Sequence, residues 1–255
     1  MKILLLLGRK PLLHSILITH CLLLLKPVIV YSQQWQVLGA EAEIAQSATN
    51  FTHITQRLEA GVAIPYAVFA EAGAIKVKKL TETSWEQVGN AVHTGSASYC
   101  RIYTAPTGQL MVTYVDGSSG NRLALRQFNP TSQNWEPLNN NANNLYLSEG
   151  SVTYTISQFA STPRSSLAFD LAGVPYVAFA DGAGFTPFVK RFVQDAWETV
   201  GGTAISTERA VGINLAIDSS DNAPWVVCLQ QSNATATTGP IRVFRLSTSG
   251  WHNVG

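Results

Sequence analysis

The stretch from Gly173 to Gly201 decides the fold, because it joins three segments that recur along the chain. It reads Gly173-Val-Pro-Tyr-Val-Ala-Phe179, then Phe188-Val-Lys-Arg-Phe192, then Trp197-Glu-Thr-Val-Gly201. Each segment is short and rich in β-branched and aromatic residues, and turn formers such as Asp181-Gly182 lie between them. The pattern predicts short strands joined by tight turns.

The tryptophan segment returns along the rest of the chain. Its copies begin at Trp35, Trp85, Trp135, Trp197 and Trp251, at intervals of 50, 50, 62 and 54 residues. The apolar segment returns as Pro65-Tyr-Ala-Val-Phe69, Leu110-Met-Val-Thr-Tyr114 and Pro224-Trp-Val-Val-Cys228. Self-similarity at such a spacing indicates that each interval folds into one small unit, which buries its apolar face against the next unit.

Four short strands in each interval are typical of a β-propeller blade. We therefore expect an all-β fold, a β-propeller of four-stranded antiparallel blades at about 52–89, 97–139, 164–201 and 210–255. The strand 35–39 is left over, which suggests an incomplete ring and a fragment of a propeller with about six to eight blades. A four-bladed ring with a spare strand is the alternative. Residues 140–163 break the spacing and predict an extra hairpin or a long loop.

These motifs resemble the tandem Gly-x-Pro-Tyr-Val-Ala-Phe and Trp-x-x-Val-Gly repeats of secreted β-propeller proteins. The resemblance covers residues 35–255, and Gly173 to Phe179 with Trp197 to Gly201 is its best copy. It implies an architecture much more than an activity. Other propeller classes fit less well, since the chain lacks the Trp-Asp ending of WD40 repeats and the paired glycines of kelch repeats.

The first 32 residues read as an export signal. Lys2, Arg9 and Lys10 precede an apolar run from Leu12 to Leu25, and Ser32 offers a small residue at a cleavage position. An uncleaved membrane anchor is the alternative, although His14, His20 and Lys26 interrupt the apolar stretch. We expect a secreted or cell-surface protein with a mature domain at 33–255 and no membrane span in the mature chain.

Composition excludes some partners. The whole chain holds 17 basic and 16 acidic residues, and without the first 32 residues the count is 13 against 16. A weakly acidic domain without a basic cluster does not suit nucleic acid. Apart from Cys21 in the export signal, the chain has two cysteines, Cys100 and Cys228. They fall in different repeats, so we expect buried free thiols and no disulfide between them.

The chain offers few candidates for chemistry. Asp170 and Asp218 occupy equivalent places before a turn, where they could form a ring of carboxylates or could cap the turn. Tyr176 and Trp225 share one strand position and could stack on sugar rings or pack between blades. His53, His93 and His252 show no metal-ligand spacing and are expected at the surface or rim. We expect no metal site, no cofactor and no catalytic residue.

Two functions from different classes remain open. The first is a binding or adhesion module for an extracellular protein or glycan, with affinity spread over variable loops. The second is an exported carbohydrate-active enzyme, either a hydrolase or a lyase. A scaffold domain of a larger surface protein is a third option. The symmetric loops and the scarcity of histidines favour the first, and Asp170, Asp218, Tyr176 and Trp225 are its candidate ligand-binding residues.

Overall fold

The computed structural model describes residues 44–45, 47, 49–154, 159–182 and 184–255. The predicted signal segment 1–32 and the predicted strand 35–39 lie outside these residues. All of these residues belong to one compact unit of the chain, Leu38–Gly255. None of the helices in the described ranges is both long enough and apolar enough to span a membrane.

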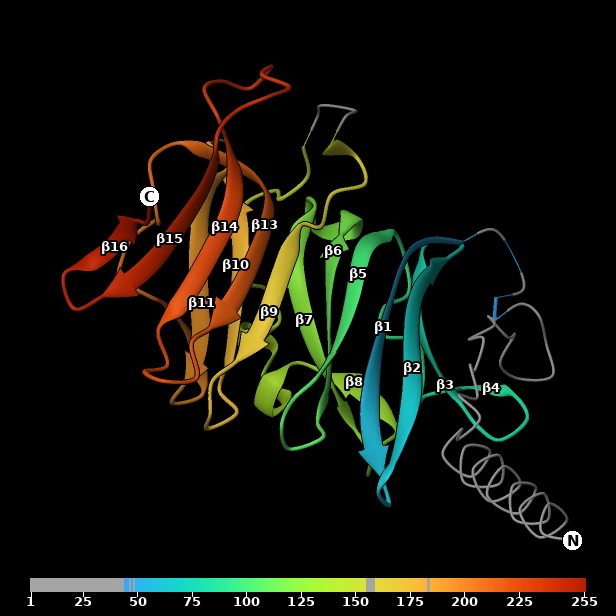
Figure 1. Ribbon diagram of the computed structural model, residues 1–255. Coiled ribbons are helices and arrows are strands. Elements are labelled where there is room, and N and C mark those ends of the chain that lie inside the picture. Colours follow the sequence, from blue (N-terminus) through green and yellow to red (C-terminus); the bar gives the residue numbers. More distant parts are fainter. Residues whose placement is uncertain (1–43, 46, 48, 155–158, 183) are drawn as a thin grey trace, which may run out of the picture. The chain divides into compact units, whose positions relative to one another are not determined.

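The described chain forms sixteen strands in four separate four-stranded antiparallel sheets (Figure 1). The first sheet contains β1 (Thr49–Glu59), β2 (Val62–Glu71), β3 (Ala74–Leu80) and β4 (Trp85–Gln87). The second contains β5 (Ala97–Thr104), β6 (Leu110–Asp116), β7 (Arg122–Asn129) and β8 (Asn134–Glu136). The third contains β9 (Ser165–Phe169), β10 (Pro175–Asp181), β11 (Thr186–Val193) and β12 (Ala196–Thr199). The fourth contains β13 (Arg209–Ile217), β14 (Pro224–Gln231), β15 (Ile241–Ser247) and β16 (Gly250–Asn253).

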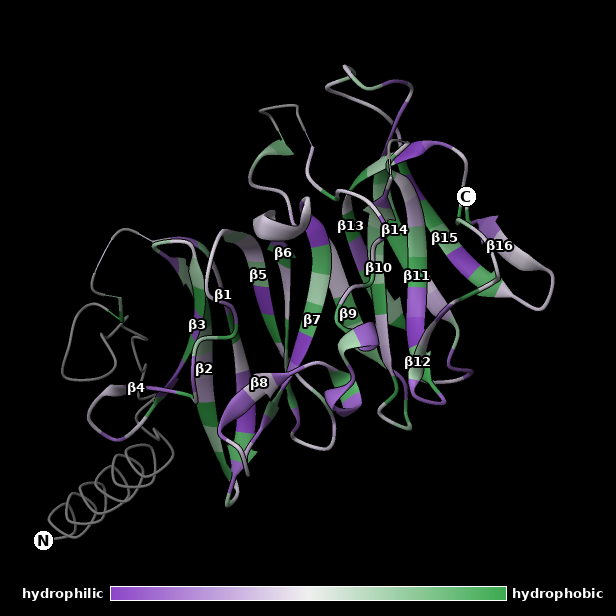
Figure 2. Cartoon of the chain, turned by 180° about the vertical axis from the view of Figure 1, so that it is seen from behind, coloured by the Kyte–Doolittle hydropathy of each residue, from purple (hydrophilic) through white to green (hydrophobic). Residues whose placement is uncertain are grey.

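In each sheet the strands follow one another in chain order, as in a propeller blade. The predicted all-β fold with four-stranded antiparallel blades is therefore confirmed. The tryptophan strand is the outer edge of every sheet, and the strands β1, β5, β9 and β13 form the opposite, inner edge. Figure 2 shows hydrophobic residues along the middle strands β10 and β14 and hydrophilic residues in the edge strands β8 and β16.

The sheets pack face to face, in chain order, through three separate apolar clusters. Val68 and Tyr114 belong to the cluster between the first and second sheets, and Phe179 belongs to the one between the second and third. Ala178 and Val226 belong to the cluster between the third and fourth sheets. Residues that alternate along β6 and β10 point to opposite faces, so these strands are buried on both sides and read as continuous apolar runs.

The repeated Trp-x-x-Val-Gly motif has a specific role at these junctions. The indole Nε1 of Trp135 donates a hydrogen bond of 3.0 Å to the carbonyl oxygen of Val88 in the preceding sheet, and Trp251 donates one of 3.1 Å to Val200. Each glycine after the acceptor valine has a positive φ and leaves room for the next sheet. A Cβ on Gly201 would come within 2.8 Å of Trp251 Nε1.

The segment 140–163 alters the junction between the second and third sheets. Two short 3-10 helices, Leu138–Asn140 and Ala142–Asn144, lead into a stretch that pairs with β7, where Leu147 N–H donates to the carbonyl of Leu123 at 2.9 Å. Trp197 accordingly donates to the carbonyl of Asn144, not to a residue of the Trp135 segment. The insertion, predicted as a hairpin or loop, therefore fills this junction and then leads to the inner edge.

Candidate functional site

The inner strands are interrupted near their N-terminal ends. The pairing register shifts between Asn50 and His53 in β1, between Ser98 and Arg101 in β5, and between Val211 and Asn214 in β13. Such bulges disrupt the ladder locally and redirect side chains, and they are frequent next to functional sites. The positive φ angles of Phe51, Tyr99 and Gly212 lie inside these interruptions.

The bulges bring His53 of the first sheet against Arg101 of the second. The backbone N–H of Ile102 lies 3.3 Å from His53 Nδ1, and Arg101 Nη2 lies 3.2 Å from His53 Nε2. Both neighbours are hydrogen-bond donors; a neutral imidazole can accept at one ring nitrogen and the imidazolium at neither, so this arrangement disfavours the protonated form. Burial and, secondly, the positive charge of Arg101 lower the pKa of His53 in agreement with this arrangement.

A cavity of about 160 Å³ opens beside this pair. That volume is enough for a carboxylate or sulfate group. The second wall is supplied by the end of the insertion. Among the described residues, those that line the cavity include no Asp or Glu; they are Phe51, Thr52, His53, Tyr99, Cys100, Arg101, Ser161, Thr162 and Pro163.

A second arginine, Arg164, contacts two residues of the cavity wall, Tyr99 and Thr162, from the side away from the cavity. Arg164 is only 1% exposed, and its guanidinium lies between the rings of Tyr99 and Tyr154 at 4.2 and 3.9 Å from their centroids. It donates to the hydroxyl of Tyr99 at 2.9 Å and to that of Thr162 at 3.2 Å. Cation–π contacts of this kind contribute about 0.5–2 kcal/mol each and hold Tyr99 in the cavity wall.

These two arginines lack a counter-ion within the part of the chain that the structure describes. None of the described ion pairs includes Arg101 or Arg164, and Arg101 Nη1 and Arg164 Nε are buried without a hydrogen-bond partner there. Burying a positive charge without a partner is unfavourable. The site can thus offer hydrogen-bond donors and positive potential to an anionic group.

The residues predicted from the sequence lie away from this cavity, just after the C-terminal ends of β9 and β13 and near the start of β10 and β14. Asp170 Oδ1 accepts hydrogen bonds from the N–H groups of Ala172 and Val174, both at 2.9 Å. Asp218 Oδ1 accepts from the N–H and hydroxyl of Ser220, and these bonds lower its pKa. Both carboxylates therefore cap the turns that lead into the second strands, as one of the two sequence-based interpretations states.

Of the predicted residues, Asp170 and Tyr176 come together in one cavity of about 710 Å³ between the third and fourth sheets. Arg191 and Arg245 also line it. Tyr176 is 5% exposed and belongs to the apolar cluster at this junction. Trp225 points to the opposite face of its sheet, because its neighbour Val226 points into the cluster.

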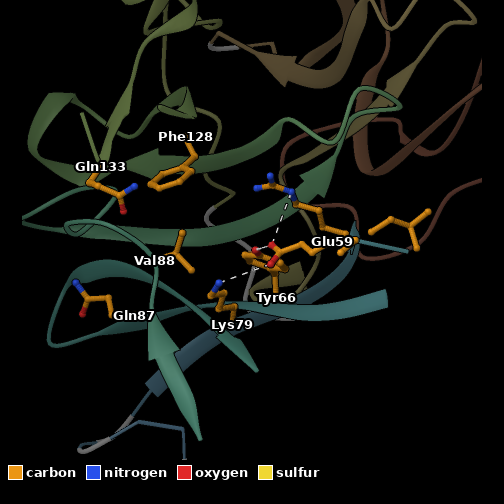
Figure 3. A pocket seen from close by; sticks show the side chains of 10 residues that line it. Glu59, Tyr66, Lys79, Gln87, Val88, Phe128 and Gln133 are labelled. Atoms are coloured by element: carbon orange, nitrogen blue, oxygen red, sulfur yellow. Dashed lines mark hydrogen bonds and ion pairs between the residues drawn. The ribbon is translucent and has the colours of Figure 1, made fainter. Parts of the chain in front are cut away.

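An equivalent cavity of about 540 Å³ lies between the first and second sheets (Figure 3). Tyr66, which corresponds to Tyr176, donates a hydrogen bond to Glu59. Lys79 Nζ and Arg57 Nε lie 3.6 and 3.8 Å from the same carboxylate, and Figure 3 shows Lys79 and Tyr66 beside Glu59. Lys79 and Arg57 already pair with Glu59, so this cavity is a weaker candidate for binding a charged ligand than the inner-strand cavity beside His53 and Arg101.

Sequence analysis missed the inner-strand site. His53 and His93, which were expected at the surface or rim, are partly buried, and His252 is exposed. His93 Nε2 lies 3.6 Å from Asp116 Oδ1, in a second buried polar cluster. The available signal was that His53 and Arg101 occupy the inner strands of successive repeats. Within the described ranges, no three His, Cys, Asp or Glu residues gather in a way that could hold a metal ion.

The two partly buried histidines predict that acid destabilises the protein. Burial is the main cause that lowers the pKa of His53 and His93 below the ordinary value of 6.5. As pH falls through 6.5, the unfolded chain takes up protons that the folded chain does not, so the free energy of unfolding decreases. In urea denaturation on both sides of this pH, His53→Gln should show a shallower dependence. Equal slopes for parent and variant would contradict this.

No family model and no curated protein sequence matches the chain. Several solved structures, in contrast, are similar to it. A PL25 ulvan lyase, solved with a -[GlcA(1-4)Rha3S]- saccharide, matches with a TM-score of 0.51 and 9% identity over 78% of this chain and 56% of that chain. A protein of unknown function from Dyadobacter fermentans matches with a TM-score of 0.50 and 10% identity over 81% and 69%. An endo-1,4-beta-xylanase from Bacteroides thetaiotaomicron matches with a TM-score of 0.49 and 12% identity over 87% and 80%.

At these identities the similarity concerns the fold alone. The chain shares a propeller-type fold with a polysaccharide lyase, and it spans little more than half of that lyase's length. What the chain binds must be argued from its own side chains.

Proposed function

We propose that this chain is an extracellular propeller module that binds an acidic polysaccharide at the cavity between its inner strands. The observation that carries the proposal is the pair of arginines, Arg101 and Arg164, at or directly behind a cavity whose described lining holds no carboxylate. Arginine binds carboxylate and sulfate groups through paired, charge-assisted hydrogen bonds. Tyr99 and the hydroxyl of Thr162 add the apolar and polar contacts that a sugar ring needs.

The saccharide bound to the ulvan lyase, -[GlcA(1-4)Rha3S]-, is consistent with this chemistry on a similar fold. The proposal keeps the glycan ligand that the binding hypothesis and the enzyme alternative have in common. It departs from the sequence-based choice of Asp170, Asp218, Tyr176 and Trp225, because none of the four lines this cavity and the two carboxylates would repel an acidic chain. Export, as proposed from the N-terminal segment, would place the module where such polysaccharides occur.

Arg101 provides the direct test. Arg101→Gln is expected to weaken binding to acidic polysaccharides at least about tenfold, since one charge-assisted contact contributes roughly 1.5–3 kcal/mol. Titration calorimetry with alginate, pectate, ulvan and chondroitin sulfate, against neutral xylan and arabinan, measures this. Arg191→Gln is the matched control, because Arg191 pairs with Glu198 in the other cavity and should leave affinity unchanged.

Two results would overturn the proposal. One is equal affinity for neutral and acidic polysaccharides, and the other is equal affinity of the parent and Arg101→Gln for the acidic ones. Added salt should weaken authentic binding, since an electrostatic contact to a partly open site is screened.

A second candidate function, lyase activity on a uronic acid chain, is favoured by the neutral His53 beside Arg101. If Arg101 turned to the uronate carboxylate and the ring hydrogen of His53 lay on Nδ1, Nε2 would be free to accept the proton from the carbon next to that carboxylate. The electron pair of that C–H bond would form a double bond as the bond to the glycosidic oxygen breaks, and the leaving oxygen would take a proton from water. Hydrolysis fits less well, because it requires two carboxyl groups about 5–9.5 Å apart.

Ultraviolet absorbance of the unsaturated product distinguishes the two functions. Elimination predicts a rise in absorbance that His53→Gln abolishes while affinity changes little. Binding without any such rise leaves the chain as a binding module.

A further inference from the structure

The sequence contains two Asn-x-Thr motifs of the kind that accept N-linked glycans, and the proposed function gives no role to either asparagine. They are Asn50-Phe51-Thr52 in β1 and Asn233-Ala234-Thr235 between β14 and β15. A third match, Asn129-Pro130-Thr131, has proline at its centre, which excludes it. A motif this short also occurs by chance, so the surroundings of each asparagine decide whether the fold can carry a glycan.

Asn233 lies in a loop that stands out from one end of the fourth sheet (Figure 1). The loop joins β14, which ends at Gln231, to β15, which begins at Ile241. Asn233, Ala234 and Thr235 are all exposed. Exposed loop tips tolerate bulky additions, because no core packing depends on their side chains. The fold therefore leaves room for a large hydrophilic group at this asparagine.

The oxygen and the nitrogen of the Asn233 side-chain amide have different environments. The oxygen, Oδ1, accepts hydrogen bonds from the backbone N–H and from the hydroxyl of Thr235, each at 2.9 Å. The nitrogen, Nδ2, donates a long hydrogen bond of 3.4 Å to the hydroxyl of Ser232, which is itself exposed. A glycan on Nδ2 replaces one of two N–H groups and leaves the oxygen unchanged. The loop thus keeps its bonds to Thr235 when the amide is modified.

The motif at Asn50 is placed differently. Asn50 pairs with Ala70 in the β1–β2 ladder, and its neighbours Phe51 and Thr52 line the inner-strand cavity. A glycan on Asn50 would lie beside the cavity that we propose for an acidic polysaccharide. Asn233 belongs to the fourth sheet, whereas His53 and Arg101 of that cavity belong to the first and second sheets. A glycan on Asn233 is therefore compatible with an open binding site.

We propose that Asn233 is an attachment site for an N-linked oligosaccharide, which a lipid diphosphate-linked oligosaccharide donates during export. Asn233 Nδ2 forms a bond to the anomeric carbon of the sugar, and the bond from that carbon to the diphosphate oxygen breaks. The electron pair leaves with the diphosphate, and the amide loses one proton to a base of the transferase. The inference rests on the export proposed from the N-terminal segment and is independent of the polysaccharide site.

The test expresses the full chain in a eukaryotic cell that secretes proteins, and analyses the medium and the cell extract. Peptide-N-glycosidase F in heavy-oxygen water converts each glycan-bearing asparagine to labelled aspartate, which peptide mass spectrometry locates. The label is expected at Asn233 and should be absent when the enzyme is omitted. Thr235→Ala should abolish it, whereas Thr235→Ser, which keeps the hydroxyl, should retain it. Asn50→Gln is the matched control and should leave the label at Asn233 unchanged.

Three results would overturn the proposal. The first is a secreted chain without label at Asn233, including one that carries sugar only on Thr237 or Thr238, since that sugar would be O-linked. The second is a label at Asn233 that survives Thr235→Ala, because the motif would then not be what is recognised. The third is a chain that stays unmodified inside the cell, because export to the transferase is part of the proposal. None of these readouts involves polysaccharide affinity, so they leave the binding function to its own test.

Discussion

Replacing Trp135 with alanine is expected to lower the free energy of unfolding by about 3–5 kcal/mol, the usual cost of removing a large buried aromatic side chain. Trp135 is 4% exposed and packs against Phe128 at a ring-centroid distance of 5.2 Å. Its indole also spans the junction between the first two sheets, because Nε1 donates to the carbonyl of Val88 at 3.0 Å. The substitution thus removes packing within one sheet and a contact to another.

Trp135→Phe separates these two contributions. It keeps an aromatic ring but leaves the buried carbonyl of Val88 without its donor, for a loss of about 1–3 kcal/mol. Urea denaturation followed by circular dichroism measures both variants. A loss below about 1 kcal/mol for Trp135→Ala would show that the tryptophan does not hold the two sheets together.

Gly89→Ala is expected to cost about 2–5 kcal/mol, from left-handed backbone strain together with overpacking. Gly89 has a φ of +63°, and a Cβ there would lie 2.4 Å from the backbone oxygen of Gln133 and 2.8 Å from the ring of Phe128. The backbone oxygen belongs to the hairpin that carries Trp135, so it cannot move without shifting the junction. The motif therefore requires glycine for space as well as for conformation.

Gly202→Ala is the matched control for Gly89→Ala. Gly202 has a similar φ of +75°, but an added Cβ meets nothing within 4 Å. It should show only the conformational part of the cost, about 1–2 kcal/mol. Comparison of the two midpoints in urea gives the difference, and equal losses would mean that the close approach of the second sheet is not restrictive.

The two predictions share a physical basis in how neighbouring repeats recognise each other. Tryptophan supplies a donor and a large apolar surface, valine supplies the acceptor, and the following glycine allows the approach. Where Leu138-Asn139 replaces the valine and glycine, the carbonyl of Asn144 in the insertion takes over as acceptor for Trp197. This exchange explains how a long insertion is tolerated without loss of the junction.

The sequence by itself determined the repeat, the four-stranded units and the order of the strands. This follows because strand alternation, turn formers and the tryptophan spacing are local properties that survive in any arrangement of the sheets. It also determined that Asp170 and Asp218 can cap turns, since their partners are two to four residues away.

Only the tertiary structure decided the inner-strand site. His53 and Arg101 are 48 residues apart, and Arg164 and Tyr99 are 65 apart, so no local pattern joins them. They meet because the sheets stack and because bulges turn the inner strands at one level. The absence of a counter-ion beside these arginines, among the described residues, is a property of the packed sheets that composition cannot reveal.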